Sequence, residues 1–198
     1  MKRLFVLYFD TSNVTIDDLL KSPYLSNKDK LSFEKYKVEV TKKEKIVSTI
    51  FKNKYIQEYK INDYGKPISE NRFFNISHSH GYVVFVLDNS PIGIDIEQIR
   101  SFNSDLIDFV SNKEEMDYIH DEISFFEIWT NKEALVKALG TGIKIRPNQI
   151  PALPINSQRI YEGKKYFSKT IIFNGYVISV SCNSDEPFEI EMKEEKLD

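Results

Sequence analysis

The sequence is poor in cysteine and has no long apolar segment. Cys182 is the single cysteine among 198 residues, so the chain cannot form an internal disulfide. The longest apolar run near the start covers residues 4–9 and ends at Asp10, which is too short for a membrane span or a signal peptide. These absences predict a reduced, cytoplasmic protein that does not associate with membranes.

Aromatic residues are abundant, and the lysines are unevenly distributed. With 14 Phe, 11 Tyr and 41% hydrophobic residues, the chain can bury a core as one large domain or two small ones, which excludes disorder. The net charge is −3, yet residues 21–66 contain 12 lysines and 6 acidic residues. This basic stretch is either a binding site for an anionic ligand or a solvated helix face.

The order of hydrophobic patterns predicts two halves that each run from helices into strands. A strand is expected over 4–9, helices over much of 15–60, and a β-hairpin formed by 82–87 and 91–97. The pattern restarts with short helices over 104–109 and 112–119 and a longer helix from about 124 to 139, where Gly140 would end it. Three strands follow over 159–162, 165–173 and 176–182, with an Asn174-Gly175 turn and a buried Cys182.

Two carboxylates share one face of the strand over 91–97. Side chains alternate along a strand, so Asp95 and Glu97 point away from the isoleucines, and their Cα atoms lie roughly 6.5 Å apart. Both carboxylates could reach one hard cation, and Gly93 on the same face would let a ligand approach the backbone. The alternative is an exposed sheet face with polar residues outward.

The helix that contains Trp129 carries charged residues within its apolar arc. Lys132 falls inside the arc, Glu133 lies at its edge, and Lys137 follows Glu133 by one turn. One interpretation is a lysine that reaches solvent beside a Glu133–Lys137 surface pair. The other is a helix face that closes over an anionic, metal-bearing site.

A polar segment, Asn75-Ile76-Ser77-His78-Ser79-His80, precedes the first of these strands. A His-x-His pair can bind zinc, with Asp95 and Glu97 as oxygen ligands. Serine hydroxyls and an imidazole are equally suited to phosphate oxygens. A polar entry into a strand is the third interpretation.

Taken together and in this order, the three motifs resemble those of the 4'-phosphopantetheinyl transferase superfamily. Asn-Ile-Ser-His-Ser, Gly-Ile-Asp-Ile-Glu and Trp-x-x-Lys-Glu-Ala followed by a lysine all occur, and Tyr64-Gly65-Lys66-Pro67 extends the resemblance. The length is similar to that of the larger, pseudo-dimeric, surfactin-synthetase-activating class. The resemblance implies an α+β fold of two similar α/β subdomains in a pseudo-twofold arrangement, over 1–98 and 99–198, each with helices packed on an antiparallel sheet. It also implies a monomer.

The resemblance implies Mg²⁺-dependent transfer of phosphopantetheine from coenzyme A to a serine of an apo acyl or peptidyl carrier protein. Adenosine 3',5'-bisphosphate would be released. Asp95, Glu97 and Glu133 match the metal-binding carboxylates. The serine proton would pass to Glu133, or to a metal-bound water that Glu97 orients.

Further residues match positions that contact coenzyme A. Lys137 matches the lysine at the pyrophosphate, and Lys132 is expected to neutralise the same cluster. The other expected contacts are Ser77, His78, Lys66, Lys28, Lys30 and Lys43. Lys43 stands where many members have arginine, and a lysine cannot make the bidentate phosphate contact. His80 lies outside the motif and is expected to be incidental.

Three other functions compete with the transferase. They are an inactive relative that binds carrier protein or coenzyme A, a metal-dependent phosphohydrolase using His78, His80, Asp95 and Glu97, and a nucleic-acid binder using the lysines. Overall acidity and the lack of an RNA-binding motif count against nucleic acid. The residues do not identify which carrier protein would be the partner.

Overall fold

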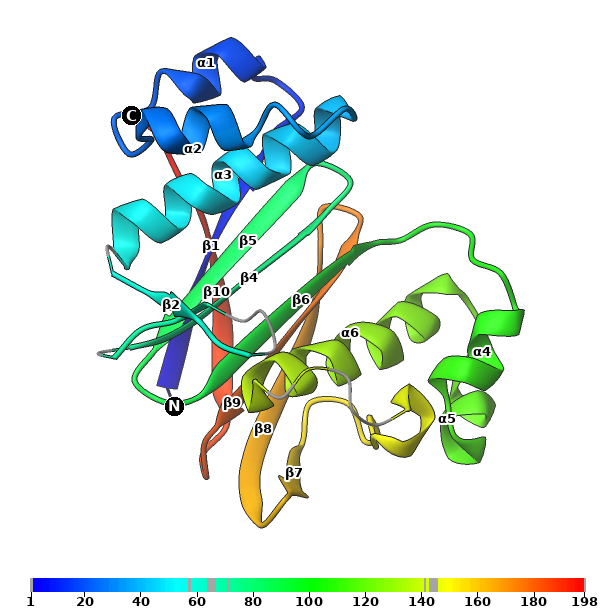
Figure 1. The fold of residues 1–198 in the computed structure, drawn as a ribbon. Helices are drawn as coiled ribbons and strands as arrows, with labels where there is room; N and C mark the ends of the chain where they lie inside the picture. Colours follow the sequence, from blue (N-terminus) through cyan, green and yellow to red (C-terminus); the bar gives the residue numbers. More distant parts are fainter. Residues whose placement is uncertain are drawn as a thin grey trace.

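Two four-stranded sheets flanked by helices make up most of the protein in a computed structural model (Figure 1). The structure describes residues 2–56, 58–63, 67–70, 72–140, 142 and 146–197. The first sheet has the strand order β10-β1-β5-β4, with β10 (Phe188–Glu194), β1 (Lys2–Asp10), β5 (Tyr82–Asp88) and β4 (Phe73–Ser79). The second has the order β6-β9-β8-β7, with β6 (Ile92–Gln98), β9 (Tyr176–Asn183), β8 (Lys164–Phe173) and β7 (Gln158–Tyr161). A short ladder joins β2 (Lys60–Ile61) to β3 (Pro67–Ile68).

The sheets confirm most predicted strands but not the predicted hairpin. β5 forms its hairpin with β4, whereas β6 pairs antiparallel with β9, so the expected pairing of 82–87 with 91–97 is wrong. The physical reason is burial: β6 is buried from Ile92 to Ile96, and its isoleucines pack against Ile178 and Val180 of β9. The alternative of an exposed polar sheet face therefore does not hold for residues Ile92 to Ile96 of β6.

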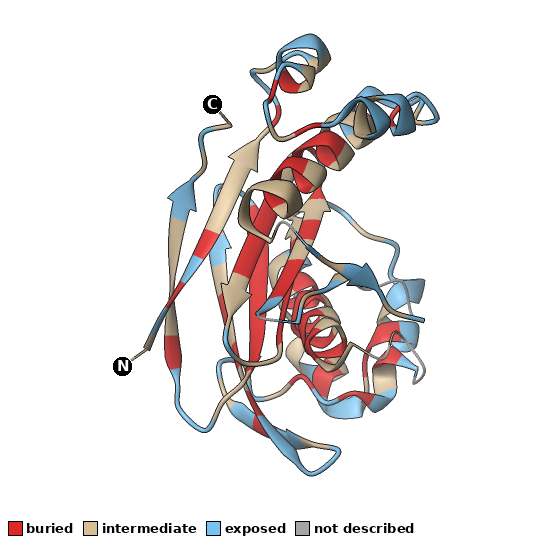
Figure 2. Cartoon of the chain, turned by 60° about the vertical axis from the view of Figure 1, so that its left-hand side comes forward, coloured by how far each residue is buried: buried red, intermediate tan, exposed pale blue. Residues whose placement is uncertain are grey.

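A helix packs on each sheet. α3 (Glu39–Tyr55) buries Ile46, Val47, Ile50 and Phe51 against Phe85 and its neighbours in the first sheet. α6 (Glu122–Leu139) packs against the second sheet, as predicted. Figure 2 shows that buried residues are concentrated on the central strands and on the helix faces that meet them. The smaller helices are α1 (Ile16–Leu20), α2 (Asn27–Ser32), α4 (Asp105–Val110), α5 (Lys113–Tyr118) and the 3-10 helix η1 (Pro147–Gln149).

Local signals account for the limits of α6. Asp121 caps its first turn by accepting a hydrogen bond from the backbone N–H of Ser124, and Gly140 ends it at a φ of 72°. The two short helices before α6 and the β8–β9 hairpin at Asn174-Gly175 also confirm the sequence predictions. Cys182 is buried in β9, as expected.

The predicted α+β fold class is confirmed, with helices packed on sheets that are mainly antiparallel. The exception is β10, which pairs parallel with β1 and so adds a strand from the end of the chain to the first sheet. The pseudo-twofold relation and the division at residue 98 remain predictions. Within the described ranges, no helix has the length and apolar character required to cross a membrane.

Candidate active site

The two sheets meet along a seam of polar side chains between β4 and β6. The backbone N–H of Ile94 donates to Asn75 Oδ1 at 3.0 Å, and Ser77 Oγ donates to Asp95 Oδ1 at 2.9 Å. Two residues further along, the Ser79 hydroxyl also contacts β6. Alternation along β4 gives these three residues a common face, so the Asn-x-Ser-x-Ser pattern joins the sheets.

Glu97 lies at the exposed end of this seam. Its Oε2 accepts a hydrogen bond from Ser79 Oγ at 3.0 Å and lies 3.9 Å from the guanidinium of Arg100. Ser79 Oγ in turn accepts from the backbone N–H of Gln98 at 3.3 Å. Burial and the nearby charge of Asp95 raise the pKa of Glu97.

Gly93 lets α6 lie directly against β6. A Cβ atom at this position would lie 2.1 Å from the carbonyl oxygen of Ala134 and 2.3 Å from the backbone nitrogen of Ala138. Real Cβ atoms do not approach backbone so closely, so any larger residue would push the helix away. This contact brings Glu133 and Lys137, on the same segment of α6, towards the carboxylates of β6.

Lys137 and Asp95 form the closest contact of the site. Lys137 Nζ lies 2.5 Å from Asp95 Oδ1 and 3.0 Å from Ser77 Oγ. Asp95 is 5% exposed, and its Oδ2 is buried without a hydrogen-bond partner in the part of the chain that the structure describes. A buried, unsatisfied carboxylate oxygen is costly unless a cation or donor approaches it.

Glu133 adds a third carboxylate to the site. Burial and the charge of Asp95 raise the pKa of Glu133 to about 6, with Lys137 opposing the shift and Glu97 adding to it. The charge of Asp95 thus acts on both Glu97 and Glu133, which places the three side chains in one electrostatic neighbourhood. Asp95 and Glu97 come from β6 and Glu133 from α6, and their role as a metal-binding set remains a prediction.

The oxygen atoms of the site are suitable ligands for a hard cation, although the side chains do not form a complete coordination site. Carboxylate oxygens are the ligands that Mg²⁺ prefers. The three carboxylates of the site supply them, and they include the buried Asp95 Oδ2. Among the described residues, no three His, Cys, Asp or Glu side chains stand close enough to hold a metal as a group. The Lys137 ammonium occupies one side of Asp95 and neutralises it in this arrangement.

His78 sits in a separate cluster on the α3 side of β4. Its Nδ1 lies 3.1 Å from Glu44 Oε2 and its Nε2 lies 2.9 Å from Lys45 Nζ, a lysine that the sequence reasoning did not single out. Glu44 is also held by the backbone N–H of Gly81 at 2.8 Å. Burial acts to raise the pKa of Glu44, but the contacts with His78 and Gly81 outweigh it and lower that pKa. Lys45 directly precedes the buried Ile46 on α3. This position beside the apolar face of the helix is the signal in the sequence that could have identified it.

The predicted lysines are divided between several surroundings. Lys43 pairs with Glu39 at 2.8 Å on α3. Lys28 and Lys30 lie on α2, the first exposed and the second half-buried. Lys66 lies outside the described residues. His80 is exposed in the β4–β5 turn, with its Nδ1 3.0 Å from Ser79 Oγ.

Lys132 does not join the carboxylates of β6, contrary to expectation. It is 1% exposed, and its ammonium pairs with Glu115 at 2.5 Å and donates to backbone carbonyls. A buried ammonium needs such partners, and the side of α6 that carries Lys132 faces α4, α5 and η1. The apolar arc therefore contains a paired charge that never reaches the metal cluster.

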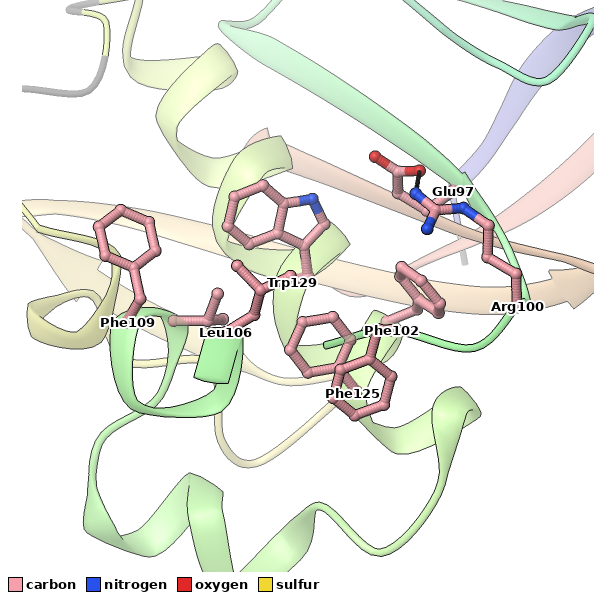
Figure 3. A pocket seen from close by; sticks show the side chains of 9 residues that line it. Glu97, Arg100, Phe102, Leu106, Phe109, Phe125 and Trp129 are labelled. Atoms are coloured by element: carbon pink, nitrogen blue, oxygen red, sulfur yellow. Dashed lines mark ion pairs between the residues drawn. The ribbon is translucent and has the colours of Figure 1, made fainter. Parts of the chain in front are cut away.

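An apolar pocket opens beside Glu97 (Figure 3). It has a volume of about 190 Å³, and aromatic and aliphatic side chains from α4, α6 and the preceding loop line it. Trp129 and Glu97 both line this pocket, and so do Leu106 and Phe109 of α4, whose side chains are exposed. The sequence places Trp129 on a helix with an apolar arc but does not predict the pocket, because α4 contributes to it only through the tertiary fold.

Comparison with known proteins gives consistent matches. Residues 91–181 match the model of the 4'-phosphopantetheinyl transferase superfamily. The chain is 35% identical over 133 residues to 4'-phosphopantetheinyl transferase gsp of Aneurinibacillus migulanus, covering 61% of this chain and 56% of that protein. It is 38% identical to psf-1 of Bacillus pumilus (40% and 38% covered) and 35% identical to Sfp of Bacillus subtilis strain 168 (42% and 41% covered). The matched region thus spans about half the length of these relatives, or less.

Proposed function

Residues 91–181 match the 4'-phosphopantetheinyl transferase superfamily, and on this premise we propose that the chain is a phosphopantetheinyl transferase. It transfers the 4'-phosphopantetheine arm of coenzyme A to a serine of an apo acyl or peptidyl carrier protein and releases adenosine 3',5'-bisphosphate. The observation that carries this proposal is the cluster of Asp95, Glu97, Glu133 and Lys137 where β4, β6 and α6 meet. The protein is also proposed to be cytoplasmic and monomeric.

We propose that Mg²⁺ is held by the carboxylates of Asp95, Glu97 and Glu133. When bound, the cation neutralises charge that develops on the pyrophosphate as its bond breaks. Ser77 and Lys137 hold Asp95 Oδ1 in place, which leaves the buried Oδ2 as the unsatisfied acceptor. Lys137 contributes a cation at the same point, and we assign it to the pyrophosphate of coenzyme A.

Removal of the serine proton has two candidate routes. Glu133 can accept it directly, and its pKa of about 6 suits a base that works near neutral pH. In the second route a water accepts the proton, and Glu97, fixed by Ser79, orients that water. Both routes use a carboxylate of the same cluster.

Coenzyme A is proposed to extend from this cluster towards the lysine-rich helices. Ser77 belongs to both regions because its hydroxyl contacts Asp95 and Lys137 while its neighbour His78 faces α3. Ser77 and His78, with Lys28, Lys30, Lys43 and Lys66, are the residues assigned to the phosphates. The contacts of His78 with Glu44 and Lys45 favour this role over the metal ligation that a phosphohydrolase would need.

A direct assay tests the proposal. A panel of apo fatty-acid, polyketide and peptide carrier proteins is incubated with coenzyme A and Mg²⁺, and mass spectrometry detects the added arm. We expect modification of at least one carrier, dependence on the divalent cation, and release of adenosine 3',5'-bisphosphate. Folded protein that modifies no carrier while binding coenzyme A would favour the inactive relative instead.

A further inference from the structure

Lys132 joins four elements of the second half through one buried ammonium group. It donates to the carbonyl oxygen of Val110 at the end of α4 (2.7 Å), to that of Pro147 in η1 (2.9 Å) and to the Glu115 carboxylate of α5 (2.5 Å). An ammonium group has three N–H donors, so these three contacts satisfy it fully. Lys132 itself belongs to α6, which packs on the second sheet.

Glu115, the carboxylate partner of Lys132, accepts two further hydrogen bonds. Its Oε2 also accepts from the backbone N–H of Asn112 at 2.9 Å, and its Oε1 accepts from the backbone N–H of Ala152 at 2.7 Å. The glutamate is fully buried. The Lys132–Glu115 pair therefore fixes α5, the end of α4 and the segment around 147–152 relative to α6.

α4 depends on such external contacts for its position. It has only six residues, and its N-cap Ser104 makes no capping hydrogen bond. Helices of this length are not stable alone in water. Three of its four apolar residues, Leu106, Phe109 and Val110, nevertheless form one wall of the pocket, with Glu97 and Trp129 also lining it (Figure 3).

We infer that Lys132 is a positioning residue, which holds α4 as a wall beside the carboxylates and thereby sets the affinity for the acceptor protein. The inference rests on the proposed function, because the acceptor serine must reach Glu97 and Glu133 past this wall. Lys132 touches neither the carboxylates of the site nor the pocket, so its effect passes through the Val110 carbonyl. The Michaelis constant for the acceptor should depend on it more than the turnover number does.

The experiment compares the wild type with the Lys132→Met/Glu115→Gln double variant. Removing both charges avoids an uncompensated buried carboxylate, and Met keeps the length of the lysine stem. Lys113→Met, on the exposed side of α5, is the matched control. Steady-state kinetics with a modified carrier, coenzyme A binding by calorimetry and hydrogen exchange of residues 105–110 are measured for each protein.

We expect the double variant to raise the KM for the carrier about tenfold, to change kcat by less than about threefold, and to leave coenzyme A affinity unchanged. Exchange in α4 should accelerate, and the Lys113 variant should match the wild type. A large loss of kcat at constant KM would instead make Lys132 catalytic and overturn the inference, as would unchanged exchange in α4 or a double variant that does not fold. Wild-type protein that modifies no carrier would refute the proposed function, while the exchange of α4 would still decide whether Lys132 positions that helix.

Discussion

At the scale of single residues, Asp95 is the side chain on which the contacts of the candidate site converge. Ser77 and Lys137 bind one of its oxygens, its other oxygen is buried without a partner among the described residues, and its charge raises the pKa values of Glu97 and Glu133. A carboxylate is held in this way only if its charge is used or compensated. Lys137 compensates it here, and a metal ion would do so in the proposed reaction.

Asp95→Asn tests this role with little change in shape. The amide keeps an oxygen for Ser77 and Lys137 but removes the negative charge, so cation-dependent transfer should fall by at least about a hundredfold. Turnover is measured with a carrier that the wild type modifies, and circular dichroism checks the fold. Asp117→Asn, an exposed change on α5, is the control, and near-wild-type turnover of the Asp95 variant would remove this carboxylate from the mechanism.

Glu44 should make the free energy of unfolding of the protein depend on pH. Its pKa is lower in the folded protein than the ordinary value of 4.5, so the ionised form stabilises the fold above that pH, and the contribution disappears as the pH falls through the folded-state pKa. Glu44→Gln should therefore cost about 1–3 kcal/mol near neutral pH, the usual worth of hydrogen bonds to a charged group, and much less in acid.

Urea unfolding between about pH 2 and pH 7, a range that extends below the ordinary glutamate pKa, measures this difference. Glu58→Gln changes an exposed carboxylate and serves as the control. A cost that stays constant over the whole range would show that the ionisation of Glu44 does not contribute to stability.

At the scale of elements, the close approach of α6 to β6 determines which side chains can meet. Gly93 provides the space, since a Cβ there would collide with the backbone at Ala134 and Ala138. The helix then places Glu133 and Lys137 beside Asp95, while its other side directs Lys132 to Glu115. One helix thus carries both a site lysine and a structural lysine.

Gly93→Ala should displace α6 and separate Lys137 from Asp95. We expect a loss of about 3 kcal/mol in stability, at the upper end of what overpacking costs, and a loss of most transfer activity. Gly163→Ala is the contrasting variant, because its Cβ meets nothing within 4 Å and only its φ of +74° is unfavourable. That variant should lose about 1 kcal/mol and keep its activity. Thermal unfolding and carrier modification measure both, and equal behaviour of the two would contradict the packing argument.

At the scale of the whole molecule, strands cross between the predicted halves. β6 lies within residues 1–98 yet belongs to the second sheet, and β10 lies within residues 99–198 yet pairs with β1 in the first sheet. The side-chain seam between β4 and β6 links the two sheets further. Neither sheet is complete without strands from both halves.

The crossing strands predict that the protein unfolds in one cooperative transition. Phe188 of β10 is 1% exposed in the central core, and Phe188→Ala should cost about 3–5 kcal/mol. Both sheets should lose structure together, which calorimetry and hydrogen exchange of β5 and β9 can measure. Phe5→Ala, at a side chain that is 45% exposed on the neighbouring strand, is the control. Separate melting of the first sheet would show that the halves fold independently.

The sequence by itself determined the order and kind of most elements, the α+β class and the three motifs that carry the site. The order and kind of the elements depend on local periodicity, capping and turn residues, which are properties of neighbouring positions, whereas the fold class and the roles of the motifs are implied by the resemblance to the superfamily. Only the tertiary structure decided that β6 pairs with β9 rather than β5, that Lys45 contacts His78, and that Lys132 is buried against Glu115. Strand pairing and the surroundings of a charge depend on segments far apart in the chain, whose alternation and charge patterns are compatible with several partners.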